Sequence, residues 1–181
     1  KEAIYLTQEA EKVGADASLQ VAPYYNKPTQ DGLFQHFHAI ARATKLPIVL
    51  YSIPGRCGIE ISVDTVKRLA RDRRNIIGIK ESSGVMQRVG EIIHRAPAGF
   101  QTLVGSATTF YPSMALGAVG GILAAADFLP ELCVELYKAC VAGDQARARK
   151  LQEQLIDPTL TLVAKMGVPG VKYAMDRVGY Y

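Results

Sequence analysis

The fold of this chain is decided by the stretch Asn75-Ile76-Ile77-Gly78-Ile79-Lys80-Glu81-Ser82-Ser83. Four of its first five residues are β-branched or small, and such a short apolar run is typical of a strand buried on both faces. The run ends on Lys80. Burying an ammonium group at the end of a strand costs free energy unless the group is paired with an opposite charge, is neutralised or takes part in a reaction. Burial lowers the pKa of a lysine, and a neutral amine attacks a ketone to form a Schiff base. Lys80 is therefore a candidate nucleophile, beside the simpler interpretation that it reaches into solvent.

Strand patterns alternate with helix patterns on both sides of this stretch. The predicted strands are residues 17–22, 47–51, 76–80, 100–104 and 119–123. Helices are predicted between them, with Gly14 ending the first and Ser62 as the N-cap of the one before residue 76. After Pro130 only helices are predicted, over residues 131–141, 145–163 and 168–178, with Asp144 as an N-cap.

This alternation predicts right-handed parallel βαβ units in an α/β fold. Either an open doubly wound sheet or part of a barrel fits, but no Gly-rich dinucleotide or phosphate fingerprint follows a strand. A (β/α)8 TIM barrel is therefore favoured, and a complete one needs about 250 residues. The 181 residues predict a partial barrel of about five βα units over residues 1–128, with a C-terminal helical extension over residues 129–181. On this interpretation the first three barrel units are missing.

Composition and charge argue against several classes of function. The net charge of +4 is concentrated in a basic cluster at residues 67–74 that no aromatic platform accompanies, so nucleic-acid binding is not expected. No apolar stretch is long enough to cross a membrane. The three cysteines lack the spacing of a zinc site or a disulfide framework, which favours a reducing, cytoplasmic setting. His36 and His38 lie two apart on a predicted helix and face apart, so no metal site is expected.

Polar side chains stand at four consecutive predicted strand ends, where TIM barrels place their catalytic groups. The ends carry Tyr24 and Tyr25, then Tyr51 with Arg56, then Lys80, then Gly105 and Ser106. Together they supply an amine for an imine with a keto acid, a phenol to move protons and a guanidinium to hold a carboxylate. Simpler interpretations stay open for each: Tyr51 can cap its strand with the hydroxyl in water, Arg56 can be a surface turn residue, and the tyrosine pair can serve loop packing or a subunit contact.

Three motifs in order resemble one family. Pro23–Pro28 (PYYNKP), Leu50–Gly58 (LYSIPGRCG) and Gly78–Gly84 (GIKESSG) resemble the pyruvate-dependent class I aldolases of the dihydrodipicolinate synthase and N-acetylneuraminate lyase superfamily. The resemblance covers essentially the whole chain. It implies a lyase that condenses pyruvate with aspartate semialdehyde to 4-hydroxy-tetrahydrodipicolinate, in lysine and diaminopimelate biosynthesis. It also implies a homotetramer that needs no cofactor.

The resemblance also implies residue roles. Lys80 would form the Schiff base with pyruvate, and Tyr51 would transfer protons above it. Tyr25 would complete a proton relay in a neighbouring subunit's site, and Arg56 would bind the carboxylate of the incoming aldehyde. Gly105 and Ile122 would line the pyruvate pocket, the latter through backbone atoms, and Tyr24 resembles a position near the interface where some members bind lysine as an inhibitor.

The chain departs from the family pattern in ways that keep alternatives open. The Gly-Thr-Thr-Gly segment of the second barrel strand is absent, so this polypeptide alone is expected to be inactive. Ser52 stands where synthases usually carry Asn, and Cys57 where they usually carry Thr. The ending of the chain and the Tyr51-Ser52 pair are also similar to 4-hydroxy-2-oxoglutarate aldolase, although Arg56 favours the condensation. An alternative from another class of function is that the chain is a non-catalytic piece of a barrel. Such a piece is expected to aggregate or to need a partner.

Overall fold

The structure of the chain, a computed structural model, describes residues 1–180. The chain divides into two compact units, residues 1–103 and residues 104–181. The predicted division at residue 128 is of another kind, because it separates the barrel strands from a helical extension and does not mark compact units. It stays a prediction.

The first unit is built of βα repeats. Its strands are β1 (Ser18–Val21), β2 (Ile48–Ser52), β3 (Ile76–Glu81) and β4 (Gln101–Val104), which ends at the boundary of the unit. Its helices are α1 (Glu2–Lys12), α2 (Gln30–Arg42), α3 (Pro54–Cys57), α4 (Val63–Asp72) and α5 (Met86–Arg95). The strand order is β1-β2-β3-β4-β5, and β1, β2 and β3 pair in parallel. The predicted parallel α/β sheet is therefore confirmed, with strands within one or two residues of their predicted limits in this unit.

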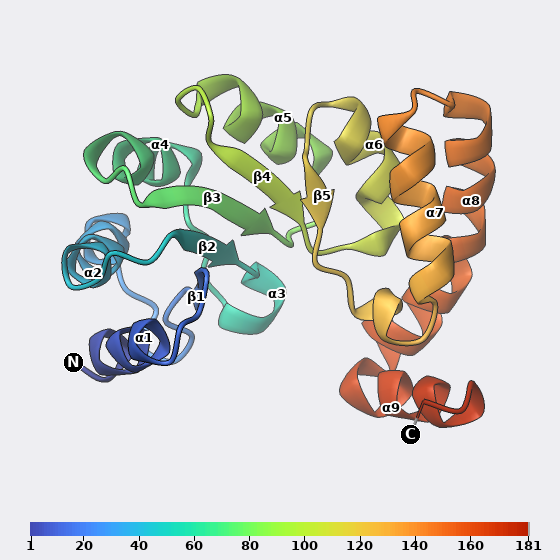
Figure 1. Ribbon diagram of the computed structural model, residues 1–181, viewed down its shortest axis with the longest axis horizontal. Helices are drawn as coiled ribbons and strands as arrows, with labels where there is room; N and C mark the ends of the chain where they lie inside the picture. The colour runs from blue at the N-terminus through green and yellow to red at the C-terminus, as the bar shows by residue number, and fades with distance from the viewer. Residues whose placement is uncertain (181) are drawn as a thin grey trace. The chain divides into compact units, whose positions relative to one another are not determined.

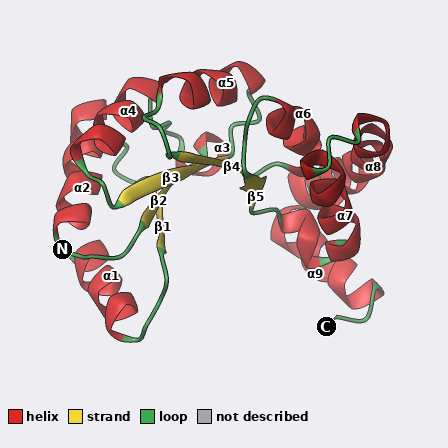
Figure 2. Cartoon of the chain, turned by 45° about the horizontal axis from the view of Figure 1, so that its top comes forward, coloured by secondary structure: helices red, strands yellow, loops and turns green. Residues whose placement is uncertain are grey.

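The larger helices cover one face of these strands. Figures 1 and 2 show α1, α2, α4 and α5 as an outer row beside β1–β4. The buried core between them includes Ile48 and Leu50 of β2, Ile79 of β3, and side chains from α2 and α4. Because successive residues of a strand point to opposite faces, Tyr51 and Lys80 lie on the face away from this core.

Local sequence signals explain most of the helix ends. The Ser62 side chain accepts a hydrogen bond from the Thr65 N–H at 3.1 Å, as expected for the predicted N-cap of α4. Gly14, after α1, has a φ of 85°, a backbone conformation that glycine adopts without a Cβ clash. The short helix α3 lies between the predicted strand 47–51 and the predicted N-cap Ser62, where no helix is expected from the sequence. Its four residues are too few to show helical periodicity, but Pro54 suits a first helical position and Gly58 ends the helix in the left-handed conformation.

Gly78 is required by the close approach of β3 and β4. A Cβ atom built on Gly78 would lie 2.5 Å from the carbonyl oxygen of Gln101, which belongs to the backbone and cannot rotate away. We expect Gly78→Ala to lower the free energy of unfolding by about 1–3 kcal/mol, the usual cost of overpacking. At Gly55 a Cβ would meet nothing within 4 Å, so Gly55→Ala is the matched control, and we expect it to change stability by less than about 0.5 kcal/mol. Urea denaturation of the two variants tests this, and equal stabilities would contradict the steric argument.

The second unit is mainly helical. Its described residues, 104–180, contain the short strand β5 (Gly120–Gly121), the 3-10 helices η1 (Ala107–Thr109) and η2 (Ala124–Asp127), the π-helix η3 (Thr159–Lys165) and four α-helices. The α-helices are α6 (Phe110–Ala115), α7 (Pro130–Val141), α8 (Gln145–Pro158) and α9 (Gly167–Arg177). Buried Gln152 connects α8 with η1 and α6, because its side chain donates to the Ala107 carbonyl at 2.7 Å and accepts from the Tyr111 N–H at 2.8 Å.

Two sequence predictions for this unit are corrected. The strand predicted over residues 119–123 is only two residues long, and the flanking Val119 and Ile122 are exposed rather than buried in a sheet. The helix predicted over residues 145–163 changes at Pro158 from α-helix to π-helix. Proline has no N–H to donate to the residue four positions earlier, which favours a change of hydrogen-bond register at that point.

Candidate active site

Lys80 and Tyr51 are brought together by strand register. They are directly paired residues of the parallel strands β3 and β2, and both are partly buried. The Lys80 Nζ atom lies 4.0 Å from the centroid of the Tyr51 ring. An ammonium group over an aromatic face at this distance is favourable, by about 0.5–1 kcal/mol at an exposed site and more where water is excluded. The contact is with the ring face and leaves the Tyr51 hydroxyl free to act on a ligand joined to Lys80.

Arg56 lies in the loop that follows this strand end. It belongs to α3 and is exposed. Its backbone N–H donates to the Ile53 carbonyl at 3.0 Å, but its side chain makes no hydrogen bond or ion pair among residues 1–180. The loop around it is nevertheless well packed, because Cys57 is 2% exposed and burial raises the pKa of its thiol. The Lys27 side chain lies over the end of α3, where its Cε atom would be 2.9 Å from a Cβ on Gly58. A packed loop therefore presents a free guanidinium.

Tyr24 and Tyr25 follow β1 and point into solvent. Their exposed fractions are 66% and 89%, so neither packs against the Lys80–Tyr51 pair within this chain. The structure does not join Tyr25 to that pair, and its role stays a prediction. Large aromatic side chains with this exposure are suited to contact another molecule.

Gly105 and Ile122 lie side by side in the second unit. Gly105 directly follows β4 and Ile122 directly follows β5. The Ile122 N–H donates to the carbonyl of Val104 at 2.9 Å, which brings the two strand ends together. A glycine and backbone atoms at such a position leave room for a small ligand, and the role of the two residues in lining a pyruvate pocket stays a prediction.

Behind Lys80 and Tyr51 the structure reveals a buried polar network that the sequence analysis missed. The next residues along the strands, Glu81 and Ser52, are also paired in register and are 2% and 0% exposed on the helix-covered face. The Glu81 carboxylate binds the Arg88 Nε atom at 2.7 Å and accepts from the Ser83 N–H at 2.6 Å. The sequence signal for this network is that a glutamate directly follows Lys80. Because neighbouring side chains of a strand point to opposite faces, the Glu81 side chain must lie on the face opposite to Lys80.

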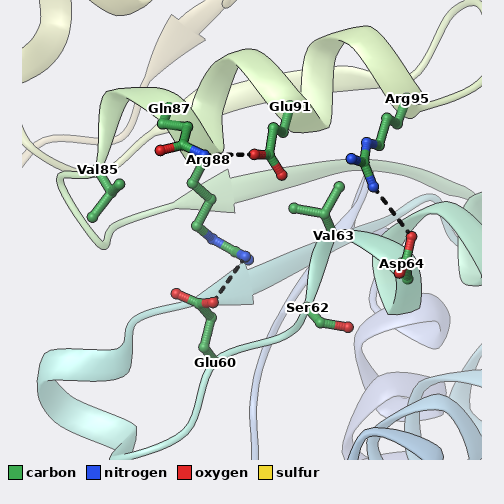
Figure 3. Close-up of a pocket in the computed structure, with 9 residues that line it drawn as sticks. All are labelled: Glu60, Ser62, Val63, Asp64, Val85, Gln87, Arg88, Glu91 and Arg95. Atoms are coloured by element: carbon green, nitrogen blue, oxygen red, sulfur yellow. Dashed lines mark hydrogen bonds and ion pairs between the residues drawn. The ribbon is translucent and has the colours of Figure 1, made fainter.

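Arg88 also joins neighbouring segments. Its guanidinium contacts the carbonyl of Ile61 and binds the Glu60 carboxylate at 3.0 Å. Figure 3 shows Arg88 extending from α5 toward Glu60, beside the separate ion pair of Arg95 with Asp64. These residues line a pocket of about 390 Å³ that does not include Lys80, Tyr51 or Arg56. Both of its arginines are ion-paired, and the pocket lies between the start of α4 and α5.

Other features of the described residues concern metals, membranes and thiols. Within residues 1–180 there is no group of three or more His, Cys, Asp or Glu side chains that could hold a metal ion. No helix in the same range is both long and apolar enough to cross a membrane. All three cysteines are free thiols, and burial raises the pKa of Cys133 to about 11.

Comparison with known proteins identifies the family. A sequence profile described as "Dihydrodipicolinate synthetase family" matches residues 1–181, the whole of the chain. The chain belongs to the dihydrodipicolinate synthetase family. The predicted family resemblance is thereby confirmed.

Curated relatives in this family are close in sequence. The 4-hydroxy-tetrahydrodipicolinate synthase of Rhizobium meliloti is 46% identical over 178 residues, which are 98% of this chain and 60% of the relative. The corresponding enzyme of Neisseria meningitidis serogroup B is 43% identical over 178 residues, again 98% of this chain and 61% of the relative. This chain therefore spans about 60% of the length of the curated family members it matches.

Solved structures of the family have the same fold. A dihydrodipicolinate synthase from Aquifex aeolicus superposes with a TM-score of 0.94 at 42% identity, covering 98% of this chain and 60% of that one. A chloride-inhibited dihydrodipicolinate synthase from Acinetobacter baumannii, in complex with pyruvate, gives 0.93 at 39% identity and covers 99% and 61%. An enzyme of the family from Cyanidioschyzon merolae, with lysine bound, gives 0.93 at 33% identity and covers 99% and 61%. The five-stranded sheet of this chain is thus part of a family barrel fold.

Proposed function

We propose that the protein carrying this sequence is a pyruvate-dependent lyase that condenses pyruvate with aspartate semialdehyde to 4-hydroxy-tetrahydrodipicolinate. The observation that carries the proposal is the pairing of Lys80 with Tyr51, with Nζ 4.0 Å from the ring centroid at adjacent strand ends. Membership of a family whose relatives are named for this product supports it, as does the pyruvate complex of the Acinetobacter baumannii relative.

The chemistry follows from an amine beside a phenol. The neutral Lys80 amine adds to the ketone carbon of pyruvate, and loss of water leaves an imine. The protonated imine draws electrons from the neighbouring methyl group, so a proton leaves that carbon and an enamine forms. The enamine carbon then bonds to the aldehyde carbon of the second substrate, whose oxygen takes up a proton, and the imine to Lys80 forms again. The amino group of the second substrate then adds to the imine carbon and displaces the Lys80 amine, which closes the ring of the product and frees the lysine. Tyr51 is the proposed group that moves these protons. Because the protonated imine that Lys80 forms with pyruvate is the electron sink, the proposed reaction needs no metal or cofactor.

The remaining residues receive proposed roles in substrate binding and assembly. Arg56 is proposed to bind the carboxylate of the semialdehyde, and Gly105 and Ile122 to line the pyruvate pocket. Tyr25 is proposed to act in a site of a second subunit within a homotetramer, which its 89% exposure supports. Three free thiols support a reducing compartment such as the cytoplasm.

The variant Arg56→Ala tests whether Arg56 binds the carboxylate of the second substrate. We expect the KM for aspartate semialdehyde to rise roughly 10- to 100-fold, because a charge-assisted hydrogen bond to a carboxylate is lost. Formation of the pyruvate imine should be unchanged, since Lys80 and Tyr51 are untouched. Steady-state kinetics together with borohydride trapping measure the two effects in the natural protein.

The control for Arg56 is Arg71→Ala, which removes another exposed arginine, on α4. This variant should leave both the KM for aspartate semialdehyde and the formation of the pyruvate imine unchanged. An Arg56→Ala variant that uses the semialdehyde normally would contradict the proposed synthase. Turnover of 4-hydroxy-2-oxoglutarate in place of the condensation would instead favour the aldolase that the Tyr51-Ser52 pair resembles.

A further inference from the structure

The backbone segment Glu60-Ile61-Ser62, called the 60–62 segment below, is held by side chains from three other places in the first unit. The Glu60 carbonyl accepts from the Gln30 side chain at 2.8 Å, and the Ser62 N–H donates to the same side chain at 2.9 Å. The Ile61 N–H approaches the Ser52 hydroxyl at 3.4 Å, and the Ile61 carbonyl contacts Arg88. Each of the four backbone groups thus has a side-chain partner.

Two of these partners, Ser52 and Arg88, are linked directly to the candidate site residues. Ser52 directly follows Tyr51 in β2, and its carbonyl accepts from the Ser82 N–H at 2.9 Å. Arg88 binds Glu81, which directly follows Lys80. The 60–62 segment is therefore fastened to the back of the two strand ends that carry Lys80 and Tyr51.

The third partner, Gln30, comes from a helix that is separate from these strand ends. It is the first residue of α2, and its carboxamide oxygen also accepts from the Thr65 hydroxyl at 2.9 Å. Thr65 in turn donates its N–H to the Ser62 cap of α4. One side chain therefore fixes both the 60–62 segment and the beginning of α4.

The Arg56 loop, residues 53–59, runs between two fixed points. It begins at Ser52, which is fully buried in β2, and ends at the 60–62 segment. The Arg56 side chain has no partner among residues 1–180, so the position of its guanidinium depends on the turn of α3, on buried Cys57 and on how firmly the two ends of the loop are held. Releasing one end of a short loop adds backbone freedom that a bound ligand must remove again.

We propose that Gln30 is a positioning residue for the second substrate, which it serves by fixing the 60–62 segment and through it the Arg56 guanidinium. The inference rests on the proposed function, since it assigns Arg56 to the carboxylate of the aldehyde. It differs from the proposed roles of Lys80 and Tyr51, because Gln30 contacts neither of them and touches no reacting atom.

Gln30→Met in the natural protein tests this inference. Methionine keeps the length and helix propensity of glutamine but removes all three hydrogen bonds. We expect the KM for aspartate semialdehyde to rise roughly 10-fold, a coupling typical of residues in one hydrogen-bond network, with little change in kcat. The rate of borohydride trapping with pyruvate should stay at the wild-type value.

The matched control is Asp31→Asn, at the next residue of α2. Asp31 also connects α2 with α4, through an exposed ion pair with Arg68 at 3.0 Å, but it does not touch the 60–62 segment. It should leave the KM unchanged. A similar rise in both variants would mean that any loosening between the helices has the same effect, and would overturn the assignment of Gln30.

A double-mutant cycle distinguishes positioning from general damage. If Gln30 acts through Arg56, then Gln30→Met in an Arg56→Ala background should add no further rise in KM. Additive effects, or an unchanged KM in Gln30→Met alone, would overturn the inference. Failure of the proposed function looks different: the folded wild-type protein would then give no pyruvate adduct on Lys80, or an adduct without any use of the semialdehyde, which also removes the role of Gln30.

Discussion

Replacing Lys80 with arginine should abolish the pyruvate imine and lower kcat/KM by about 10⁴-fold or more. Arginine keeps the positive charge over the Tyr51 ring, which lies 4.0 Å from the lysine Nζ, but its guanidinium does not form an imine with a ketone. Charge and local packing are therefore preserved while the nucleophile is removed. Borohydride trapping and steady-state kinetics report the loss, and the thermal unfolding midpoint should change little.

Lys12→Arg is the control for this replacement. Lys12 is exposed on α1, where it pairs with Glu9 at 2.7 Å, and its conversion to arginine should leave activity and trapping at wild-type levels. Residual turnover in Lys80→Arg with an imine on another lysine would contradict the assignment. Loss of activity with imine formation intact would leave Lys80 as a binding cation and not the nucleophile.

Removing Arg88 should be the most damaging change to stability. Arg88→Met leaves the Glu81 carboxylate, whose side chain is fully buried, without its cationic partner, and the carbonyl of Ile61 loses a donor. Breaking a buried ion pair from one side typically costs about 3–5 kcal/mol, because an uncompensated charge remains in the interior. Urea denaturation of the natural protein should show a loss of this size.

Two further variants test the origin of that loss. Arg95→Met removes an exposed ion pair with Asp64 from the same helix, and it should cost less than about 1 kcal/mol. Combining Arg88→Met with Glu81→Leu should recover part of the stability, because no unpaired charge is left in the core. A double variant less stable than Arg88→Met alone would show that the contacts of Glu81 with the backbone, and not its charge, dominate.

The sequence predicted the repeated architecture because its signals are local. Apolar runs such as Ile76–Ile79 and side-chain caps such as Ser62 depend on neighbours a few residues away, and the structure confirms the strand and the helix that they indicate. Short elements were not predicted correctly, because a periodic pattern can be recognised only over several residues. Helix α3 has four residues and strand β5 has two.

The site was predictable only in part, for a physical reason. Lys80 and Tyr51 stood out as polar residues at the ends of apolar strands, and strand register then pairs them. The 60–62 segment is fixed by Gln30, Ser52 and Arg88, in contacts that span 30, 9 and 27 residues of the chain, and no local pattern marks such partners. Even so, a buried glutamate one residue beyond a strand-end lysine implies a cation on the opposite face, and Arg88 is that cation.

Borohydride reduction in the presence of pyruvate, followed by peptide mass mapping of the natural protein, tests the central claim most directly. We expect one reduced pyruvyl adduct, located on Lys80, and no modification when pyruvate is omitted. A folded protein that gives no adduct, or carries it on a different lysine, would contradict the imine mechanism and return Lys80 to the role of a charged residue at the end of a strand.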